Sequence, residues 1–590
     1  MNRDYAIGLA VAGVVFATLL AGSLGLRRAR TTGDFYVAAR AVSPRWNAAA
    51  IGGEYLSAAS FLGIAGLVLA YGFDMLWYPV CYTAGYLVLL ALVAAPLRRS
   101  GAYTLPDFAQ IRLGSVRVRR LAGALVVLIG WLYLVPQLQG ASLALRTQTG
   151  APSWAGGLLV AVVVLAAVAM GGMRSITFAQ ALQYWLKFLA LFVPALVLIL
   201  VWQHRGDGLG SGYPQAPQRT VVHVGSPVTV RAPVAETLRI DGLVDGRRAT
   251  GPVHLSPGEH HLAAGTRVTL QRGDVVPVVS SLPAQRNASW LRPLGSGQQH
   301  PLYASLSLIL AICLGTMGLP HVLVRFYTNP DGRDARRTTL VVLALLSSFY
   351  LLPTVFGALG RRYVPDLLLT GDTDATVLTL PGRLVGGQGG VWLSALVTAG
   401  AFAAFLSTAS GLTVSVAGVL SQDVLRIRER TRGSGAPDQS RARRIRLFRV
   451  AAVAAIGVPY LLSLPSQHLG LAVVVGLAFA VAAATFCPLL LLGIWWPRLT
   501  VAGAFAGLLA GGVLATAAVL VTLLTSDSGW LGALLAQPAA WAVPITFVVM
   551  TAVSRATPSG TPPDVGRVMV RLHAPETLAA ELRALDRSSH

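Results

Sequence analysis

The chain has 590 residues, of which 54% are hydrophobic and 12% charged, and its mean hydropathy is +0.63. These values exclude an ordinary soluble domain and are typical of a protein with many membrane-spanning segments. The formal net charge of +23 would suit a nucleic-acid-binding protein. The arginines, however, lie mostly in short connections between apolar runs, a pattern that indicates membrane topology and argues against nucleic acid as a partner.

Thirteen apolar runs are long enough to cross a bilayer as helices. They cover residues 5–26, 46–70, 75–97, 121–147, 153–172, 176–203, 302–324, 338–360, 389–422, 447–464, 468–496, 499–524 and 537–555. Arginines gather on alternate connections, at residues 27–45, 98–120, 325–337 and 426–446. The positive-inside rule places these four connections in the cytoplasm, so we expect the N-terminus outside and the C-terminus inside.

The connection 204–301 differs in character from the rest of the chain. Short stretches of alternating polarity, such as VTVRA and RVTLQRGDVVPVV, are separated by glycine, proline and Asp-Gly pairs. This pattern predicts short strands and hairpins, hence a small β-rich insert on the outer side of the membrane. Two roles remain open for it: a lid or decoration without a ligand, or the capture of a partner or substrate.

An acidic residue, Glu54, lies in the middle of the run 46–70, next to Gly52, Gly53 and Ser57. A carboxylate at this depth is costly and usually serves a substrate, an ion or a proton. Glycine and serine also let a helix unwind and turn its carbonyls toward a cation. We therefore predict a coupling or gating role in a central cavity, whereas pairing with an arginine or a hydroxyl to fix helix packing is the alternative.

Hydroxyl side chains on one helix face offer ligands for an alkali cation. Ala404, Ser407 and Thr408 stand at positions i, i+3 and i+4 of their span. The two hydroxyls and the Ala404 carbonyl, with the carbonyls of Gly53 and Leu56, would make a shell of five oxygens. Hydroxyls that bond back to their own helix or join two helices give the alternative interpretation.

Lys187, the single lysine of the chain, lies on the same face of its span as Gln180. Its ammonium could meet an anionic substrate or Glu54; a snorkelling or structural role is the alternative. Gly318 and Pro320 mark another span that can break. These residues, together with Ser57 and Glu54, are the candidates for coupling or for lining the cavity.

Six stretches together resemble the sodium:solute symporter family over residues 30–500. They are DFYVAAR (34–40), GEYLSAASFLGIAG (53–66), YTLPDFAQIRLG (103–114), GGMRSITFAQALQ (171–183), GLPHVLVRF (318–326) and FLSTASGLTVSVAGVLSQDV (405–424). The resemblance implies an all-α polytopic protein with the LeuT-type fold, in which two five-helix repeats are inverted and the first core helix is broken. It also implies sodium at the oxygens of Gly53, Leu56, Ala404, Ser407 and Thr408.

On this basis the chain divides into six parts. They are residues 1–45, an extra helix and a cytoplasmic loop; 46–203, core helices one to five; 204–301, the β-rich insert; 302–496, core helices six to ten; 497–556, two trailing helices; and 557–590, a cytoplasmic tail.

Within the family, the chain looks most similar to bacterial acetate and monocarboxylate permeases. Residues 53–63 differ from their usual first core helix by Glu54 for Asp and Leu56 for Met, while Ser407-Thr408 is closer to the proline-transporter pattern. The resemblance implies sodium-driven import of acetate or a short monocarboxylate. Proline, another amino acid or a sugar is the alternative substrate, and a transporter-like sensor is a further alternative.

The sequence has no Walker A motif, no Gly-x-Ser-x-Gly and no cluster of metal ligands, so we do not expect an enzyme. Sodium is the expected coupling ion and no other cofactor is expected. The expected partners are the organic anion, sodium and membrane lipid, and a small membrane companion protein is compatible with this interpretation. The preference for arginine over lysine is typical of a high-G+C bacterial genome. We therefore expect a multi-pass protein of a bacterial plasma (inner) membrane.

Overall fold

The computed structural model describes residues 3–26, 43–170, 173–206, 208–295, 297, 300–326, 332–424, 437–467, 469–524 and 529–574. Most of the predicted loops 27–45 and 426–446 and the end of the tail therefore lie outside the described residues.

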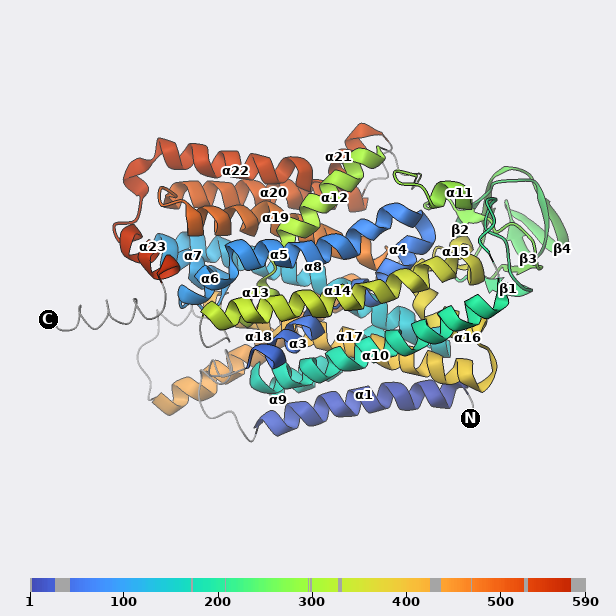
Figure 1. Cartoon of the computed structure of the whole chain (residues 1–590), viewed down its shortest axis with the longest axis horizontal. Helices are drawn as coiled ribbons and strands as arrows, with labels where there is room; N and C mark the ends of the chain where they lie inside the picture. Colours follow the sequence, from blue (N-terminus) through green and yellow to red (C-terminus); the bar gives the residue numbers. More distant parts are fainter. Residues whose placement is uncertain are drawn as a thin grey trace.

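Helices make up the membrane part of the molecule (Figure 1). In the first half of the chain they are α1 (Arg3–Leu26), α3 (Pro44–Tyr55), α4 (Ile64–Tyr71), α5 (Trp77–Leu92), α6 (Ala94–Arg99), α7 (Leu105–Leu113), α8 (Val116–Thr149), α9 (Ala155–Met170), α10 (Met173–Arg205) and α11 (Asn287–Trp290). The second half contains α12 (Pro301–Thr316), α13 (Pro320–Phe326), α14 (Gly332–Tyr363), α15 (Leu367–Thr370), α16 (Thr376–Leu384), α17 (Gly387–Val419), α18 (Pro437–Ser463), α19 (Leu471–Trp495), α20 (Val501–Leu524), α21 (Trp530–Ala536), α22 (Ala539–Ala556) and α23 (Val565–His573).

Within the described residues, eleven helical segments are long and apolar enough to span a membrane. The prediction of thirteen spans differs at two places. Helix α9 has only 16 residues, so it is shorter than a typical span. The predicted second and third spans meet in one helical run, 59–92, which turns at Gly72. Gly72 has φ +81°, and a Cβ there would strike the Trp290 carbonyl, so only glycine fits this turn.

Two helices of the core are broken. The first broken helix begins with α3 and is interrupted at residues 56–58. It then continues through a π-helical turn (Ala59–Gly63) into α4. The other consists of α12 and α13, separated at residues 317–319. Pro320 begins α13, where its missing N–H costs nothing because the first turn of a helix has no acceptor for it. Helix α10 packs against both α3 and α17, so these three helices surround the first break.

A seven-stranded antiparallel sheet lies inside the predicted insert. Its strands are β1 (Thr220–His223), β2 (Val228–Ala232), β3 (Glu236–Val244), β4 (Arg247–Leu255), β5 (Gly258–Leu262), β6 (Arg267–Leu270) and β7 (Val278–Val279), with the order β1-β6-β3-β5-β2-β7 and β4 on β3. Asp245 and Gly246 have φ +49° and +76° and join β3 to β4 as a tight hairpin turn. The apolar core of the sheet also includes Leu369 of α15, so the sheet packs on the connection between α14 and α16.

The insert also holds the end of α4. Trp290 Nε1 donates hydrogen bonds to the carbonyls of Val68 (2.8 Å) and Leu69 (3.1 Å). Arg361 of α14 donates to Leu69 O (3.2 Å) and its guanidinium lies 5.7 Å from the Trp290 ring centre. The last carbonyls of a helix have no partner within the helix. The insert therefore supplies part of the C-terminal cap of α4.

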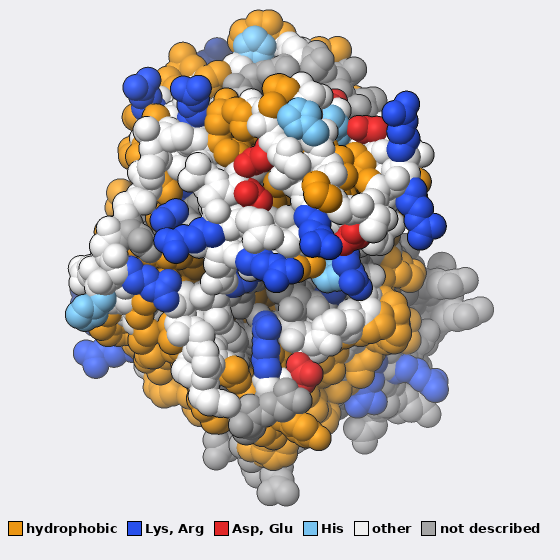
Figure 2. Space-filling view, turned by 90° about the vertical axis from the view of Figure 1, so that its right-hand side faces the viewer, with side chains coloured by type: hydrophobic (Ala, Val, Ile, Leu, Met, Phe, Trp, Pro, Cys, Tyr) orange, Lys and Arg blue, Asp and Glu red, His pale blue; other side chains and the backbone are white. Residues whose placement is uncertain are grey.

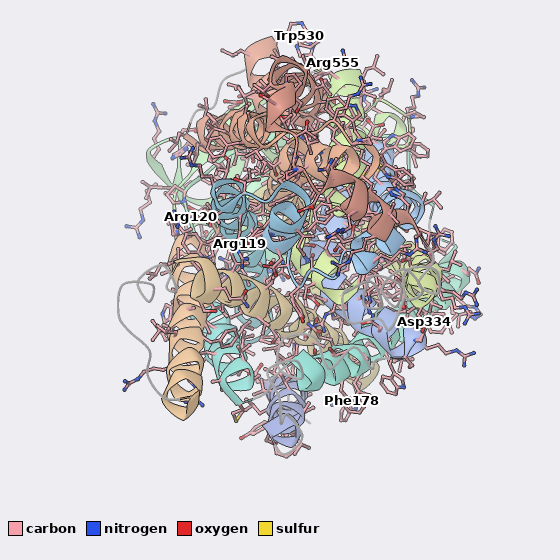
Figure 3. All side chains as sticks on the ribbon, turned by 90° about the vertical axis from the view of Figure 1, so that its left-hand side faces the viewer. Arg119, Arg120, Phe178, Asp334, Trp530 and Arg555 are labelled. Atoms are coloured by element: carbon pink, nitrogen blue, oxygen red, sulfur yellow. The ribbon has the colours of Figure 1, made fainter. Side chains whose placement is uncertain are left out.

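The sheet and the start of α1 lie at one end of the molecule, and α23 lies at the other (Figure 1). Figure 2 views the sheet end, where arginine and acidic side chains mix, while hydrophobic side chains gather around the sides below it. Figure 3 views the opposite end, with Arg119 and Arg120 near the start of α8 and Asp334 near the start of α14. An apolar girdle between two polar ends is the distribution that a bilayer demands.

Candidate functional site

The break in the first core helix exposes backbone groups that a continuous helix would pair. The carbonyls of Gly53, Glu54 and Leu56 lie at this break, and all of them are buried. The N–H of Ala58 would normally bond to Glu54 O, but it donates instead to Gln137 Oε1 of α8 (2.8 Å). Buried backbone groups need partners, and at this break side chains of other helices provide them.

The ammonium group of Lys187, on α10, occupies the centre of the predicted sodium ligands. Lys187 Nζ donates to Gly53 O, to Leu56 O (2.8 Å) and to Ser407 Oγ (2.6 Å). Ser407 Oγ in turn lies 2.7 Å from Gly53 O and 3.1 Å from Ala404 O, so its single proton can go to either carbonyl. The three donors of an ammonium thus have three acceptors.

The remaining predicted ligand, Thr408, lies beside this group but bonds elsewhere. Thr408 Oγ1 donates to Glu54 O (2.6 Å), and Gln180 Nε2 donates to Ser407 O (2.8 Å). The structure thus brings together the five residues predicted from spacing and resemblance. Their carbonyl and hydroxyl oxygens fit an alkali cation in kind, but the ammonium of Lys187 stands at the position that such a cation would need.

Glu54 pairs with an arginine of the other broken helix. Arg325 Nε of α13 donates to Glu54 Oε2 at 2.6 Å, and both side chains are at most 3% exposed. The guanidinium also donates to Thr177 Oγ1 (2.5 Å) and to Gln180 Oε1 of α10, and Asn47 Nδ2 of α3 donates to Arg325 O (3.1 Å). This network joins α3, α10 and α13. Its geometry matches the packing alternative for Glu54, and it is also an arrangement that a gate can use.

Small residues allow these helices to approach one another. A Cβ on Gly53 would collide with Gln180 O of α10, and a Cβ on Gly411 of α17 would collide with the Glu54 carboxylate. Gly53 therefore lets the backbone of α3 lie directly against that of α10, and Gly411 leaves room on α17 for the Glu54 side chain. Through this close approach Gln180 of α10 hydrogen-bonds both to Arg325 of α13 and to the backbone of Ser407 on α17.

The second break lies between α12 and α13, where Gly318 and Pro320 stand as predicted. A Cβ on Gly318 would approach Ala482 O of α19, which explains the glycine. His321 follows the break, is fully buried, and has no hydrogen-bond partner for either ring nitrogen within the described residues. Its ring lies 4.9 Å from that of Tyr133 on α8. A buried imidazole without partners needs a reason.

Aromatic side chains pack together beside the two breaks. Tyr55 lies 4.8 Å from Tyr86, Tyr82 lies 5.2 Å from Phe479, and Phe479 lies 5.9 Å from Tyr133, each measured between ring centroids. Within the described part of the chain, the hydroxyls of Tyr82 and Tyr86 have no hydrogen-bond partner. Ser57, the predicted cavity residue, is buried in the first break beside this cluster.

The sequence pattern left open that Glu54 pairs with an arginine, but it did not identify Arg325 as that partner. It also gave no role to Gln137, His321 or the aromatic cluster. His321 stands directly after Pro320 in the break motif, which is a signal that could have drawn attention to it. Tyr55 stands directly before the first break, but nothing local in the sequence connects Gln137 or the tyrosines of α5 and α8 to the breaks.

Comparisons with known proteins agree with this geometry. A model of the sodium:solute symporter family matches residues 35–234 and 270–511. The uncharacterized symporter YwcA of Bacillus subtilis (strain 168) is 30% identical over 518 residues, which cover 88% of this chain and 85% of that protein. The uncharacterized symporter H16_A2524 of Cupriavidus necator is 28% identical over 619 residues, which cover 90% and 88% of the two chains.

Two solved structures share the fold at low sequence identity. A substrate-bound, outward-open structure of a Na+-coupled sialic acid symporter aligns with a TM-score of 0.62 at 14% identity, over 94% of this chain and 98% of that one. A closed structure of Mhp1, a nucleobase-cation-symport-1 family transporter, aligns with a TM-score of 0.50 at 13% identity, over 92% and 99%. Both the predicted family and the predicted LeuT-type fold are thus confirmed. The chain belongs to the sodium:solute symporter family, a membership that supports sodium-coupled symport by a multi-pass membrane protein.

Proposed function

We propose that this protein imports a small organic anion, acetate or a short monocarboxylate, together with sodium, by alternating access. The observation that carries the proposal is the pair of broken helices. Their breaks face a buried polar and aromatic cluster, and the freed carbonyls of the first break are held by side chains of α10 and α17. Transporters of this fold bind substrate and ion at such breaks near the middle of the membrane.

The charges around the breaks favour an anionic substrate. The ammonium of Lys187 and the guanidinium of Arg325 stand against one carboxylate, that of Glu54, in this buried network. An anion that enters would reduce the imbalance between two cations and one acid. Hydroxyls of Tyr82 and Tyr86 and the His321 ring offer donors for a carboxylate.

The sodium part of the proposal rests on the family and on the oxygen set. The carbonyls of Gly53, Leu56 and Ala404 and the hydroxyls of Ser407 and Thr408 would hold the ion once the ammonium of Lys187 has moved away. A bound sodium ion would then tie α3 to α17 through neutral oxygens.

Alternating access in this fold is largely rocking or gating of one group of helices against the other around the site, so contacts on its two sides must open in turn. The Glu54–Arg325 pair joins α3 to α13, on the side of the breaks away from the sheet. On the sheet side, Trp290 and Arg361 hold the end of α4. We assign the first contact to closure toward the cytoplasm and the second to the outer side, following the arginine pattern.

Uptake into proteoliposomes tests this function. We expect labelled acetate, propionate or pyruvate to accumulate when an inward sodium gradient is imposed. Replacing Ser407 or Thr408 with alanine removes one ligand hydroxyl, so the sodium concentration for half-maximal uptake should rise by about tenfold or more. The double variant should lose sodium-driven uptake while it still folds. Full sodium-independent uptake by the double variant would contradict the assigned ion site.

The same experiment separates the alternative substrates. The Ser407-Thr408 pair, which resembles the proline-transporter pattern, favours proline as the second candidate. One of the two solved structures with this fold is a substrate-bound sialic acid symporter, so a sugar acid is a further compound to include in the uptake experiment. Accumulation of proline or of a sugar acid, with no accumulation of short monocarboxylates, would replace the substrate and retain the transporter.

The membrane orientation has its own test. We expect a cysteine introduced at Ser280, which is exposed on the sheet side, to react with a membrane-impermeant thiol reagent in intact cells. A cysteine at Arg117, exposed at the start of α8, should react only after the cells are opened. The three natural cysteines should first be replaced, because Cys313 is only partly buried. Labelling of the residue 117 variant alone in intact cells would invert the topology.

A further inference from the structure

The 590 residues include one lysine, and that lysine lies at the predicted sodium site. Of the 47 lysine and arginine residues of the chain, the other 46 are arginines. Lys187 is 0% exposed and lies near the middle of α10, so it does not snorkel to a membrane surface. An ammonium is a compact point charge with three donors, whereas a guanidinium is a planar fork. The site thus contains the side chain whose cationic head is closest in shape to an alkali ion.

The partners of Lys187 are those of a bound ion rather than those of a salt bridge. Its ammonium has two carbonyl oxygens and one hydroxyl within hydrogen-bond distance. The nearby carboxylate, Glu54, directs its Oε2 atom toward Arg325. Neutral oxygens stabilise a buried cation without neutralising it. Both an ammonium and a sodium ion would need the same oxygens, of Gly53, Leu56 and Ser407, so only one of them can be bound at a time.

We propose that Lys187 is a tethered cation that competes with sodium for this site. This inference rests on the proposed function, because it assumes that the same oxygens are the sodium ligands. In the sodium-free protein the ammonium holds α3 and α17 against α10 at the first break. Sodium enters only when the side chain leaves. Binding of the ion therefore removes the Lys187 link to α10 and adds an ion-mediated link between α3 and α17 to the hydrogen bonds that Ser407 and Thr408 already make to α3.

Sodium binding to purified protein in lipid nanodiscs tests the proposal without requiring transport. Lys187→Met keeps a similar length and removes the charge, and Lys187→Gln is a second neutral variant in case the first does not fold. If the ammonium occupies the oxygens in about nine molecules of ten, its removal lowers the apparent Kd for radioactive sodium by about tenfold. The neutral variant should also gain thermal stability from sodium, whereas the wild type should gain much less.

Two controls make the result specific. Adding Ser407→Ala to the neutral variant should abolish the gain in sodium affinity, because one of the shared oxygens is lost. Lys187→Arg keeps the charge but not the compact head, and it should bind sodium no better than the wild type. Equal sodium affinity in the wild type and both neutral variants would overturn the proposal. So would a gain that Ser407→Ala leaves unchanged, because the sodium would then bind elsewhere.

The uptake experiment separates this inference from the proposed function. If the wild type and Lys187→Met bind sodium equally and Ser407→Ala weakens both, the sodium site stands and only the competition is wrong. If no variant binds sodium while the wild type still accumulates the organic anion, the sodium part of the proposed function fails together with the competition.

Discussion

Glu54→Gln should strongly destabilise the protein and abolish uptake. The change leaves Arg325 buried without the carboxylate that it contacts at 2.6 Å. Removing one partner of a buried ion pair typically costs about 3–5 kcal/mol, because the other charge then remains uncompensated. We expect a clear fall in the unfolding temperature of the detergent-solubilised protein, and loss of solute accumulation in proteoliposomes. Arg325→Met should have an effect of similar size, because it strands the Glu54 carboxylate.

The double variant Glu54→Gln/Arg325→Met distinguishes packing from function. Because it leaves neither charge buried alone, it should recover much of the stability that each single change loses. If the pair serves closure or coupling, uptake stays low in this stable protein. Glu54→Asp retains the charge, one methylene shorter, and should keep more uptake than Glu54→Gln. Normal uptake by Glu54→Gln at every pH would leave the pair a packing role only.

Trp290→Ala should weaken the outer end of the first broken helix. The indole of Trp290 is buried and caps two carbonyls of α4, while the Arg361 guanidinium lies against its ring. Truncating a buried tryptophan typically costs about 3–5 kcal/mol, and the loss here also strips hydrogen bonds from Val68 and Leu69. We expect a lower unfolding temperature and slower uptake, because the end of α4 loses its hold on the insert and on Arg361 of α14.

A matched control is Trp392→Ala on α17, where the side chain is 57% exposed on the apolar surface. It should change stability little.

Replacing only the sheet, residues 214–281, with a short flexible linker should preserve uptake. Replacing all of 204–301 also removes Trp290 and should therefore abolish or slow uptake. Full uptake by the larger replacement would show that the cap is dispensable. We therefore expect that only the sheet of the insert is dispensable for uptake, and that the segment around Trp290 is needed.

Several features of the fold could be predicted because they depend on nearby residues. The breaks lie where the sequence combines Gly52, Gly53 and Ser57, or Gly318 and Pro320, since these residues decide locally whether a helix can continue. The Asp-Gly turn between β3 and β4 follows from the same kind of local preference. The predicted boundary between the second and third spans, at residues 71–74, contains the turn at Gly72, whereas the predicted span 153–172 forms a helix of only 16 residues.

Sequence by itself determined the membrane class, the family and the candidate oxygens, because apolar length, motif order and the i, i+3, i+4 spacing are properties of the chain. Only the tertiary structure decided what meets those oxygens. Lys187 lies 134 residues from Gly53 and 220 from Ser407, and Arg325 lies 271 residues from Glu54. Which of two buried cations pairs with the one acid depends on how α3, α10, α13 and α17 pack. That packing depends on Gly53, which lies against the backbone of Gln180, and on Gly411, which leaves room for the Glu54 side chain, and no local pattern encodes it.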